Sequence, residues 1–113
     1  MAGVSTAALL EALIAACDSS PLVTAYTVQE MDEDILSVRV YLQDDAFIHA
    51  FYNVATGKVS FALVKGQRLY GKDNAKRGWH VHPFDQPATH VACAPVDFAT
   101  FLHEVENYYQ GGK

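Results

Sequence analysis

His80, His82 and His90 lie close together in the sequence, shortly after Asp73. One residue separates His80 from His82, so in an extended backbone their side chains project from the same face. Histidine exchanges protons near neutral pH, and two histidines can serve as general acid and general base. Three histidines, alone or with Asp73, are also a ligand set that divalent metal ions accept. A third interpretation is a strand whose histidines only face solvent.

Basic residues are concentrated just before these histidines. Six of the eight lysines and arginines fall between positions 58 and 77, where Asp73 is the only acidic residue. The rest of the chain holds two basic and twelve acidic residues, and the whole carries a net charge of −5. This asymmetry is typical of a local anion-binding face, although solvated strand edges and turns also produce it. It favours anion chemistry over metal chemistry, so we expect neither a bound metal ion nor another cofactor.

A ribonuclease that works without a metal would use this part of the chain in three ways. His80 and His82 would exchange protons with the reacting phosphodiester, and Asp73 would orient a histidine. Other polar side chains would contact the phosphate, and aromatic side chains would stack on an unpaired base. The candidates for the phosphate are Arg68, Lys72, Arg77 and His90, and those for the base are Tyr70 and Trp79. Trp79 also suits a hydrophobic lid.

The remaining histidines and the cysteines give weaker signals. His49 alternates with phenylalanines in an apolar run, which is typical of a strand residue, and His103 fits a solvated helix surface. Cys17 and Cys93 lie in apolar segments without CxxC spacing, which indicates buried thiols. The sequence contains no Gly-rich phosphate loop, GxSxG or HExxH motif.

Length and composition indicate one globular domain spanning residues 1–113. Half of the residues are apolar and 19% are charged, which is ordinary for a folded domain of this size. The first twenty residues lack the basic region of a signal peptide, and no apolar run approaches the ~20 residues that span a bilayer. We expect a cytoplasmic protein with no membrane partner.

Helical spacing of apolar residues predicts a helix at each end of the chain. The first carries apolar residues between positions 10 and 17, has Ser5 or Thr6 as its N-cap and stops at residues 18–21. The second begins after Asp97 as its N-cap and ends at the glycines 111–112.

Between these helices, five β-rich runs are joined by short turns. Connections this short make successive strands antiparallel neighbours, which predicts a meander. The segment 79–84 is either a short edge strand or an extended loop, and 89–96 supplies a short sixth strand. The five runs are residues 22–30, 35–43, 46–54, 58–64 and 67–72.

These elements predict an α+β domain with an antiparallel meander of five to six strands and both helices packed on one face. The other face would carry Tyr41, Phe47 and Phe51 uncovered. The alternative to an enzyme is therefore a non-catalytic binding or interaction module that forms a homodimer through this face.

The segment RLYGKDNAKRGWHVHPFDQPATHV, which precedes the last helix, resembles the TumE-like toxins of prokaryotic toxin–antitoxin pairs. That family has an aromatic residue at a strand end, then Asp-Asn, a histidine pair followed by proline, and a second histidine-rich cluster. The pattern falls here on Asp73 and Asn74, on His80 and His82 with Pro83, and on Pro87 and His90. In this chain Val81 splits the histidine pair, and His90 alone stands for the second cluster.

The resemblance covers roughly residues 22–108. It implies a toxin-like protein that acts on RNA and is held by a DNA-binding antitoxin partner. It also adds Asn74 to the residues expected to bind the substrate.

Overall fold

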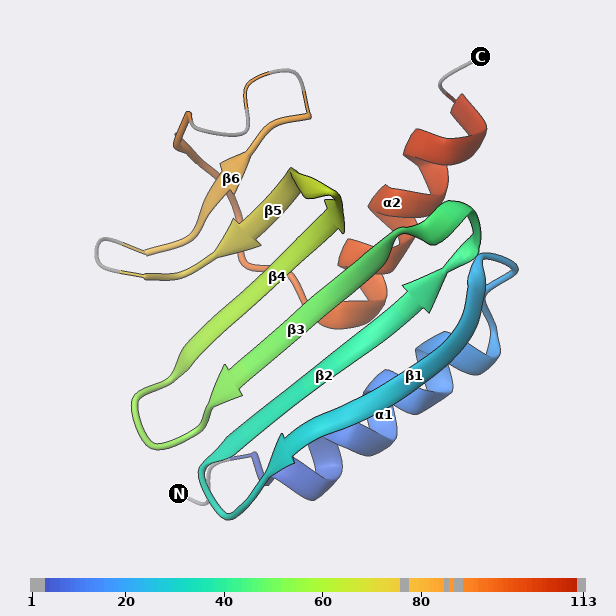
Figure 1. Cartoon of the computed structure of the whole chain (residues 1–113). Coiled ribbons are helices and arrows are strands. Elements are labelled where there is room, and N and C mark those ends of the chain that lie inside the picture. Colours follow the sequence, from blue (N-terminus) through green and yellow to red (C-terminus); the bar gives the residue numbers. More distant parts are fainter. Residues whose placement is uncertain (1–3, 76–77, 85, 87–88, 112–113) are drawn as a thin grey trace.

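The computed structural model describes residues 4–75, 78–84, 86 and 89–111. These residues form one antiparallel sheet, with one helix before it and one after it in the chain (Figure 1). The predicted α+β class, with a meander between an N-terminal and a C-terminal helix, is thereby confirmed. The elements are α1 (Thr6–Asp18), β1 (Val23–Met31), β2 (Ile35–Leu42), the 3₁₀ turn η1 (Gln43–Asp45), β3 (Phe47–Asn53), β4 (Lys58–Lys65), β5 (Gln67–Asp73), β6 (His80–His82), β7 (Val91–Ala92) and α2 (Phe98–Gly111).

The sheet has seven strands, more than the five to six predicted. Each strand pairs with its neighbour in the chain, as short connections require. The histidine segment forms β6 against β5, and the two residues of β7 extend the sheet further. Strands this short carry too few residues to show an alternating pattern, which is why sequence periodicity does not reveal both of them.

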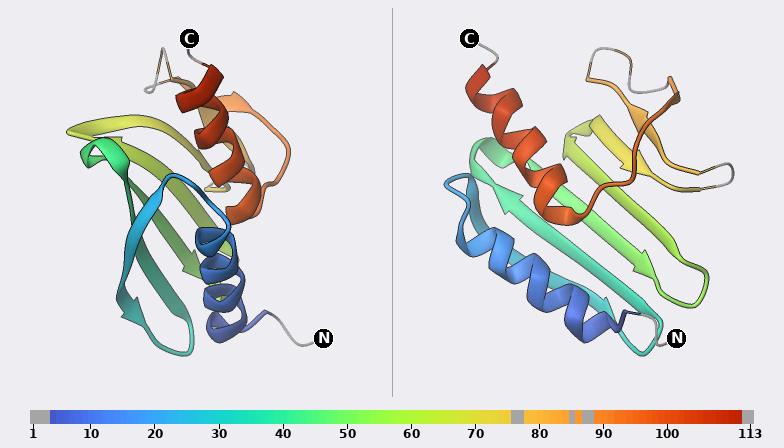
Figure 2. Two further views of the ribbon diagram at one scale, coloured as in Figure 1. Left: turned by 90° about the vertical axis from the view of Figure 1, so that its right-hand side faces the viewer. Right: turned by 180° about the vertical axis from the view of Figure 1, so that it is seen from behind.

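The two helices begin at the predicted caps. The hydroxyl of Ser5 accepts a hydrogen bond from the backbone N–H of Ala8 at 3.0 Å, and Asp97 accepts one from the N–H of Thr100 at 2.8 Å. Both helices lie on the same face of the sheet, as predicted (Figure 2). Within the described residues, neither helix is long and apolar enough to cross a membrane.

The core lies between the sheet and the two helices. Alternate residues of β2, β3 and β4 point toward the helices and are buried. Phe61 is central, because its ring contacts Phe98 and Phe101 of α2 at centroid distances of 5.9 and 5.4 Å. This contact packs α2 against β4. The buried apolar strand residues are Leu36, Val38, Val40, Leu42, Ile48, Ala50, Tyr52, Phe61 and Leu63.

We call the sheet face opposite the helices the open face. Residues that pair across neighbouring antiparallel strands share a face, so the strand register assigns its members. From β2 to β5 they are Ile35, Ser37, Arg39, Tyr41, Phe47, His49, Phe51, Asn53, Lys58, Ser60, Ala62, Val64, Arg68, Gly71 and Asp73.

Candidate functional site

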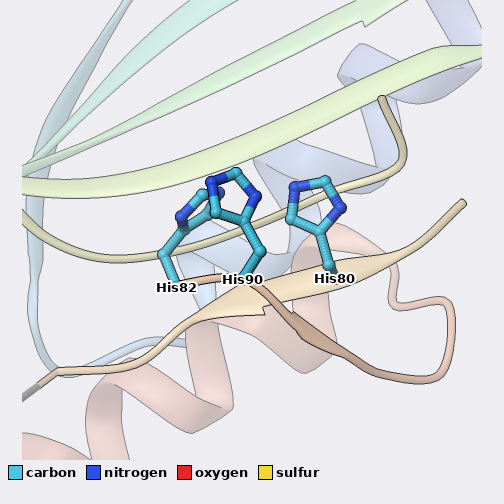
Figure 3. A group of neighbouring side chains, drawn as sticks. All are labelled: His80, His82 and His90. Atoms are coloured by element: carbon cyan, nitrogen blue, oxygen red, sulfur yellow. The ribbon is translucent and has the colours of Figure 1, made fainter. Parts of the chain in front are cut away.

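The register of the last three strands places the histidines on the open face. Asp73 of β5 pairs with His80 of β6, and Gly71 pairs with His82. His80 and His82 therefore share the face of Asp73, as their spacing predicts. His90 stands directly before β7, which pairs with β6, and its ring lies beside the other two (Figure 3).

The three imidazole rings form a compact group. Their centroids are separated by 5.1 Å between His80 and His82, 4.8 Å between His80 and His90, and 4.5 Å between His82 and His90. One ring nitrogen from each residue lies within 4.8 Å of the other two. His82 is buried at 2% exposure, whereas His90 is exposed. The group is therefore closed at His82 and open to solvent at His90.

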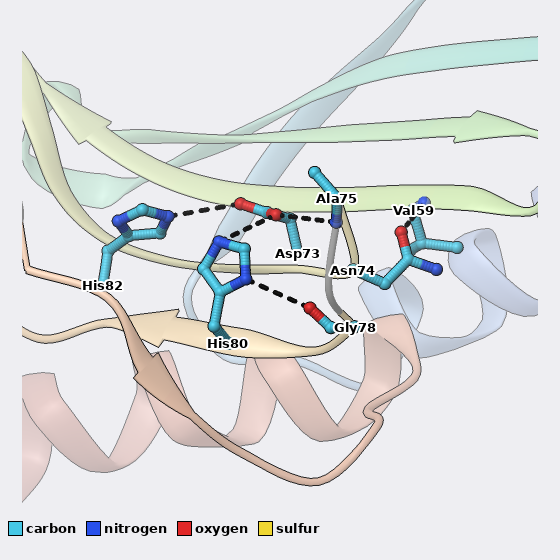
Figure 4. Close-up of polar contacts among 7 residues, drawn as sticks. All are labelled: Val59, Asp73, Asn74, Ala75, Gly78, His80 and His82. Atoms are coloured by element: carbon cyan, nitrogen blue, oxygen red, sulfur yellow. Dashed lines mark hydrogen bonds and ion pairs between the residues drawn. The ribbon is translucent and has the colours of Figure 1, made fainter.

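Asp73 joins two of these rings. Its Oδ1 lies 3.1 Å from Nε2 of His80, and its Oδ2 lies 3.2 Å from Nε2 of His82 (Figure 4). Oδ1 also accepts a hydrogen bond from the backbone N–H of Ala75 at 3.0 Å, which holds the carboxylate in place. We refer to Asp73, His80, His82 and His90 together as the His–Asp cluster.

The contact of the other nitrogen of His80 defines the tautomer of its neutral ring. Nδ1 lies 3.1 Å from the carbonyl oxygen of Gly78, and because a carbonyl only accepts, Nδ1 must donate. In a neutral ring Nε2 would then carry a lone pair, and it would face Oδ1 of Asp73 at 3.1 Å. Two acceptors at this distance repel each other. The contact is favourable only when a proton on Nε2, or a metal cation, lies between them.

The surroundings of His90 favour its neutral form. Desolvation is the largest cause of a lowered pKa at His90. Positive charge on His82 and His80 lowers this pKa further, and Arg68 acts in the same direction. Asp73 opposes them. A neutral imidazole at the exposed side of the cluster can accept a proton or offer a lone pair.

Arg68 reaches the open face through an irregularity in β5. Val64 pairs with Arg68 while Leu63 pairs with Tyr70, so Leu69 is an extra residue in the ladder. Without this bulge, the alternation from Tyr70 would point Arg68 toward the helices. Its side chain instead passes over Gly71, where a Cβ would lie 3.6 Å from Cδ of Arg68.

Two predicted substrate contacts lie on the other face. Tyr70 donates to Oε1 of Glu104 and Lys72 donates to Oε2 of the same carboxylate, both at 2.8 Å. The ring of Tyr70 also stacks on Phe84 at 4.2 Å and on Phe101 at 5.4 Å. Both residues therefore tie β5 to α2, and the structure does not bring them to the His–Asp cluster.

Two further predicted contacts are also not part of the cluster. Trp79 is partly buried against the core, with its ring 6.5 Å from that of Phe61, which fits a hydrophobic lid. Asn74 accepts from the N–H of Val59 and donates to the carbonyl of Gly57, both at 2.8 Å, so it anchors the start of β4. Arg77 lies outside the described residues.

The basic stretch does not form one continuous patch in the part of the chain that the structure describes. Lys65 contacts Asp44 at 2.6 Å, and Lys72 is held by Glu104. Lys58 lies 5.8 Å from the ring centroid of Phe51. The charge of Arg68, another residue of this stretch, acts on the pKa of His90 in the His–Asp cluster.

Sequence reasoning missed two backbone features of the site, the carbonyl of Gly78 and the bulge at Leu69. Gly78 has a φ of 106°, a conformation that residues with side chains rarely adopt, and its glycine identity was the available signal. The bulge left no such signal, because it arises from the pairing of β5 with β4. The two other histidines lie elsewhere, His49 bonded to Ser37 at 2.8 Å and His103 exposed on α2.

Comparisons with family models, with curated proteins and with solved structures found no match. The likeness to TumE-like toxins therefore stays a prediction.

Proposed function

We propose that the protein is a toxin-like ribonuclease of a toxin–antitoxin type system, and that it cleaves RNA at the His–Asp cluster without a metal. One observation carries this proposal: a single carboxylate contacts the Nε2 atoms of His80 and His82, with His90 beside them. Such a group combines a held proton donor with a neighbouring acceptor, which is the requirement for general acid–base catalysis. In the same proposal, a DNA-binding antitoxin protein keeps the toxin inactive.

The 2′-hydroxyl of RNA is the nucleophile in this scheme. His90, at the exposed side, removes the proton of the 2′-hydroxyl as its oxygen attacks the phosphorus. His80 gives its Nε2 proton to the 5′-oxygen as the P–O bond breaks. The products are a 2′,3′-cyclic phosphate and a 5′-hydroxyl end. Asp73 positions the ring of His80 through Oδ1, and the ring of the buried His82 lies beside that of His90, with centroids 4.5 Å apart.

Arg68 supplies positive charge for the phosphate. Its side chain passes over Gly71, directly beside His82 in the sheet register. A guanidinium at this place stabilises the negative charge that grows on the phosphate oxygens in the transition state. The phosphate contact is therefore assigned to Arg68 and no longer to Lys72.

The test is cleavage of a labelled RNA by purified protein in the presence of EDTA. We expect His80→Ala and His90→Ala each to lower the cleavage rate by about 100-fold or more, because each removes one proton-transfer group. His103→Ala is the matched control, since the side chain of His103 is 77% exposed on α2 and outside the cluster. Cleavage at the wild-type rate by His80→Ala and His90→Ala would contradict the proposal, as would an inactive wild-type protein.

A second candidate function is a non-catalytic module that dimerises through the open face. Tyr41, Phe47 and Phe51 lie half-buried on this face, and both helices cover the other one (Figure 2). If a second copy packs here, Phe51→Glu should convert a dimer to a monomer in size-exclusion chromatography with light scattering. A monomeric wild-type protein would exclude this candidate.

A further inference from the structure

We propose that the His–Asp cluster is also a binding site for one divalent transition-metal ion such as Zn²⁺. The ligands are one ring nitrogen each from His80, His82 and His90, and a carboxylate oxygen of Asp73. This inference goes beyond the proposed function, because it requires neither RNA nor catalysis. It revises the expectation from sequence that the histidines hold no metal.

The spacing of the donor atoms suits a tetrahedral ion. Zn²⁺ binds histidine nitrogen at about 2.0–2.1 Å, which separates neighbouring ligand atoms by about 3.4 Å in a tetrahedron. Oδ1 of Asp73 already lies 3.1 Å from Nε2 of His80, and the other oxygen, Oδ2, lies 3.2 Å from Nε2 of His82. The three ring nitrogens lie within 4.8 Å of one another, so small side-chain rotations bring them to the metal-bound distance.

A backbone contact already orients one of the ligands. His80 donates from Nδ1 to the carbonyl of Gly78, which aims Nε2 into the cluster. Metal-bound histidines usually donate their second ring nitrogen to a carbonyl or carboxylate in this way, and the contact fixes the tautomer that binds the metal. Gly78 reaches this arrangement with a φ of 106°, which disfavours any other residue there.

The two acceptor atoms that face each other at His80 provide a further argument. Nε2 of His80 and Oδ1 of Asp73 face each other at 3.1 Å, and a positive species must lie between two such acceptors. A divalent cation satisfies this requirement at His80, as a proton on Nε2 does, and the carboxylate that faces His80 also contacts Nε2 of His82. Imidazole nitrogen is a preferred ligand of zinc, copper and nickel, which sets the class of ion.

The site also has an entrance and a closed end. His82 is buried at 2% exposure, whereas His90 is exposed, so an ion enters from the solvent beside His90. If the proposed RNA cleavage is correct, metal and catalysis compete, because the metal occupies the nitrogens that transfer protons. Zn²⁺ is then an inhibitor, and only this consequence rests on the proposed function.

The test uses the full chain, purified without a histidine tag and freed of metal by dialysis. Titration with Zn²⁺ in a calorimeter should give one site per chain, and Co²⁺ should give the strong visible absorption of a tetrahedral complex. His90→Ala should weaken Zn²⁺ binding at least about tenfold, since it removes a ligand at an exposed position that folding does not require. His49→Ala and His103→Ala should bind as the wild type does.

Two results would overturn the inference: wild-type protein without a stoichiometric site, or unchanged affinity in His90→Ala, which would mean adsorption elsewhere on the surface. Binding is measured without RNA and cleavage is measured in EDTA. A chain that binds Zn²⁺ but cleaves no RNA would therefore refute the proposed function alone, and a chain that cleaves RNA but binds no Zn²⁺ would refute the metal site alone.

Discussion

Strand β5 contributes to two polar groups on opposite faces of the sheet. Toward the helices, Tyr70 and Lys72 both donate to Glu104. Toward the open face, Asp73 contacts the rings of His80 and His82. Each group is built on one carboxylate with two partners, so composition alone does not separate a structural group from a reactive one.

The difference lies in what surrounds each carboxylate. On the helix side, the ring of Tyr70 is stacked between aromatic residues, and Lys72 is only 12% exposed at its side chain. These contacts lock β5 to α2. On the open face, the exposed His90 stands beside the paired rings and leaves the cluster accessible. Accessibility of a convergent polar group, more than its presence, distinguishes the proposed site from the Glu104 group.

The largest expected effect comes from replacing one of the two carboxylates, that of Asp73, by an amide. Asp73→Asn should lower RNA cleavage in EDTA by about 100-fold, because an amide no longer stabilises the protonated ring of His80. Glu104→Gln should leave the cleavage rate within about twofold of the wild type, since its partners do not touch the cluster. Equal losses in both variants would remove the distinction between the two faces.

The second prediction concerns stability on the helix side. Glu104→Ala should lower the free energy of unfolding by about 2 kcal/mol, because it strips two hydrogen-bond partners and leaves the mostly covered Lys72 without its counter-charge. Urea unfolding followed by circular dichroism measures the change. His103→Ala, on the neighbouring exposed position of α2, should change stability by less than about 0.5 kcal/mol. A Glu104→Ala protein with the same free energy of unfolding as the wild type would contradict the structural role of Glu104.

A third prediction addresses the path of Arg68 across β5. Gly71→Ala would place a Cβ 3.0 Å from the carbonyl oxygen of Phe61 and 3.6 Å from Cδ of Arg68. We expect a loss of about 1 kcal/mol in stability from this close backbone contact, together with weaker RNA binding at low salt. Fluorescence anisotropy with labelled RNA measures the binding. Unchanged binding in Gly71→Ala and in Arg68→Gln would exclude Arg68 from the phosphate contact.

The smallest expected effect is the pH dependence of stability that His49 contributes. His49 is the histidine of the open face that lies outside the His–Asp cluster. Burial, and next the charge of Arg39, lower the pKa of His49 below its ordinary 6.5 in the folded state. The unfolded chain then binds the proton more readily, so His49 supports folding above pH 6.5 and loses this contribution as the pH falls through its folded pKa. Unfolding midpoints should therefore drop less on acidification in His49→Gln than in the wild type. Identical pH profiles would refute this role.

Much of the fold was predictable because its signals are local. Apolar spacing and the caps at Ser5 and Asp97 indicate the helices, and short turns between β-rich runs indicate the meander. The placement of His80 and His82 on one face follows from their spacing alone. The partners of Tyr70 and Lys72 were not predictable, because Glu104 is 34 and 32 residues away in sequence.

The amino-acid sequence by itself determines which side chains are available and which neighbours share a face, because alternation along a strand depends only on local backbone geometry. Only the tertiary structure decides which carboxylate meets which ring. Asp73 reaches both His80 and His82 through the register of β5 and β6, and His90 joins them through β7. Arg68 faces the site because a bulge shifts β5 against β4. Pairing between strands is a property of the whole sheet, and it turns scattered histidines into one cluster.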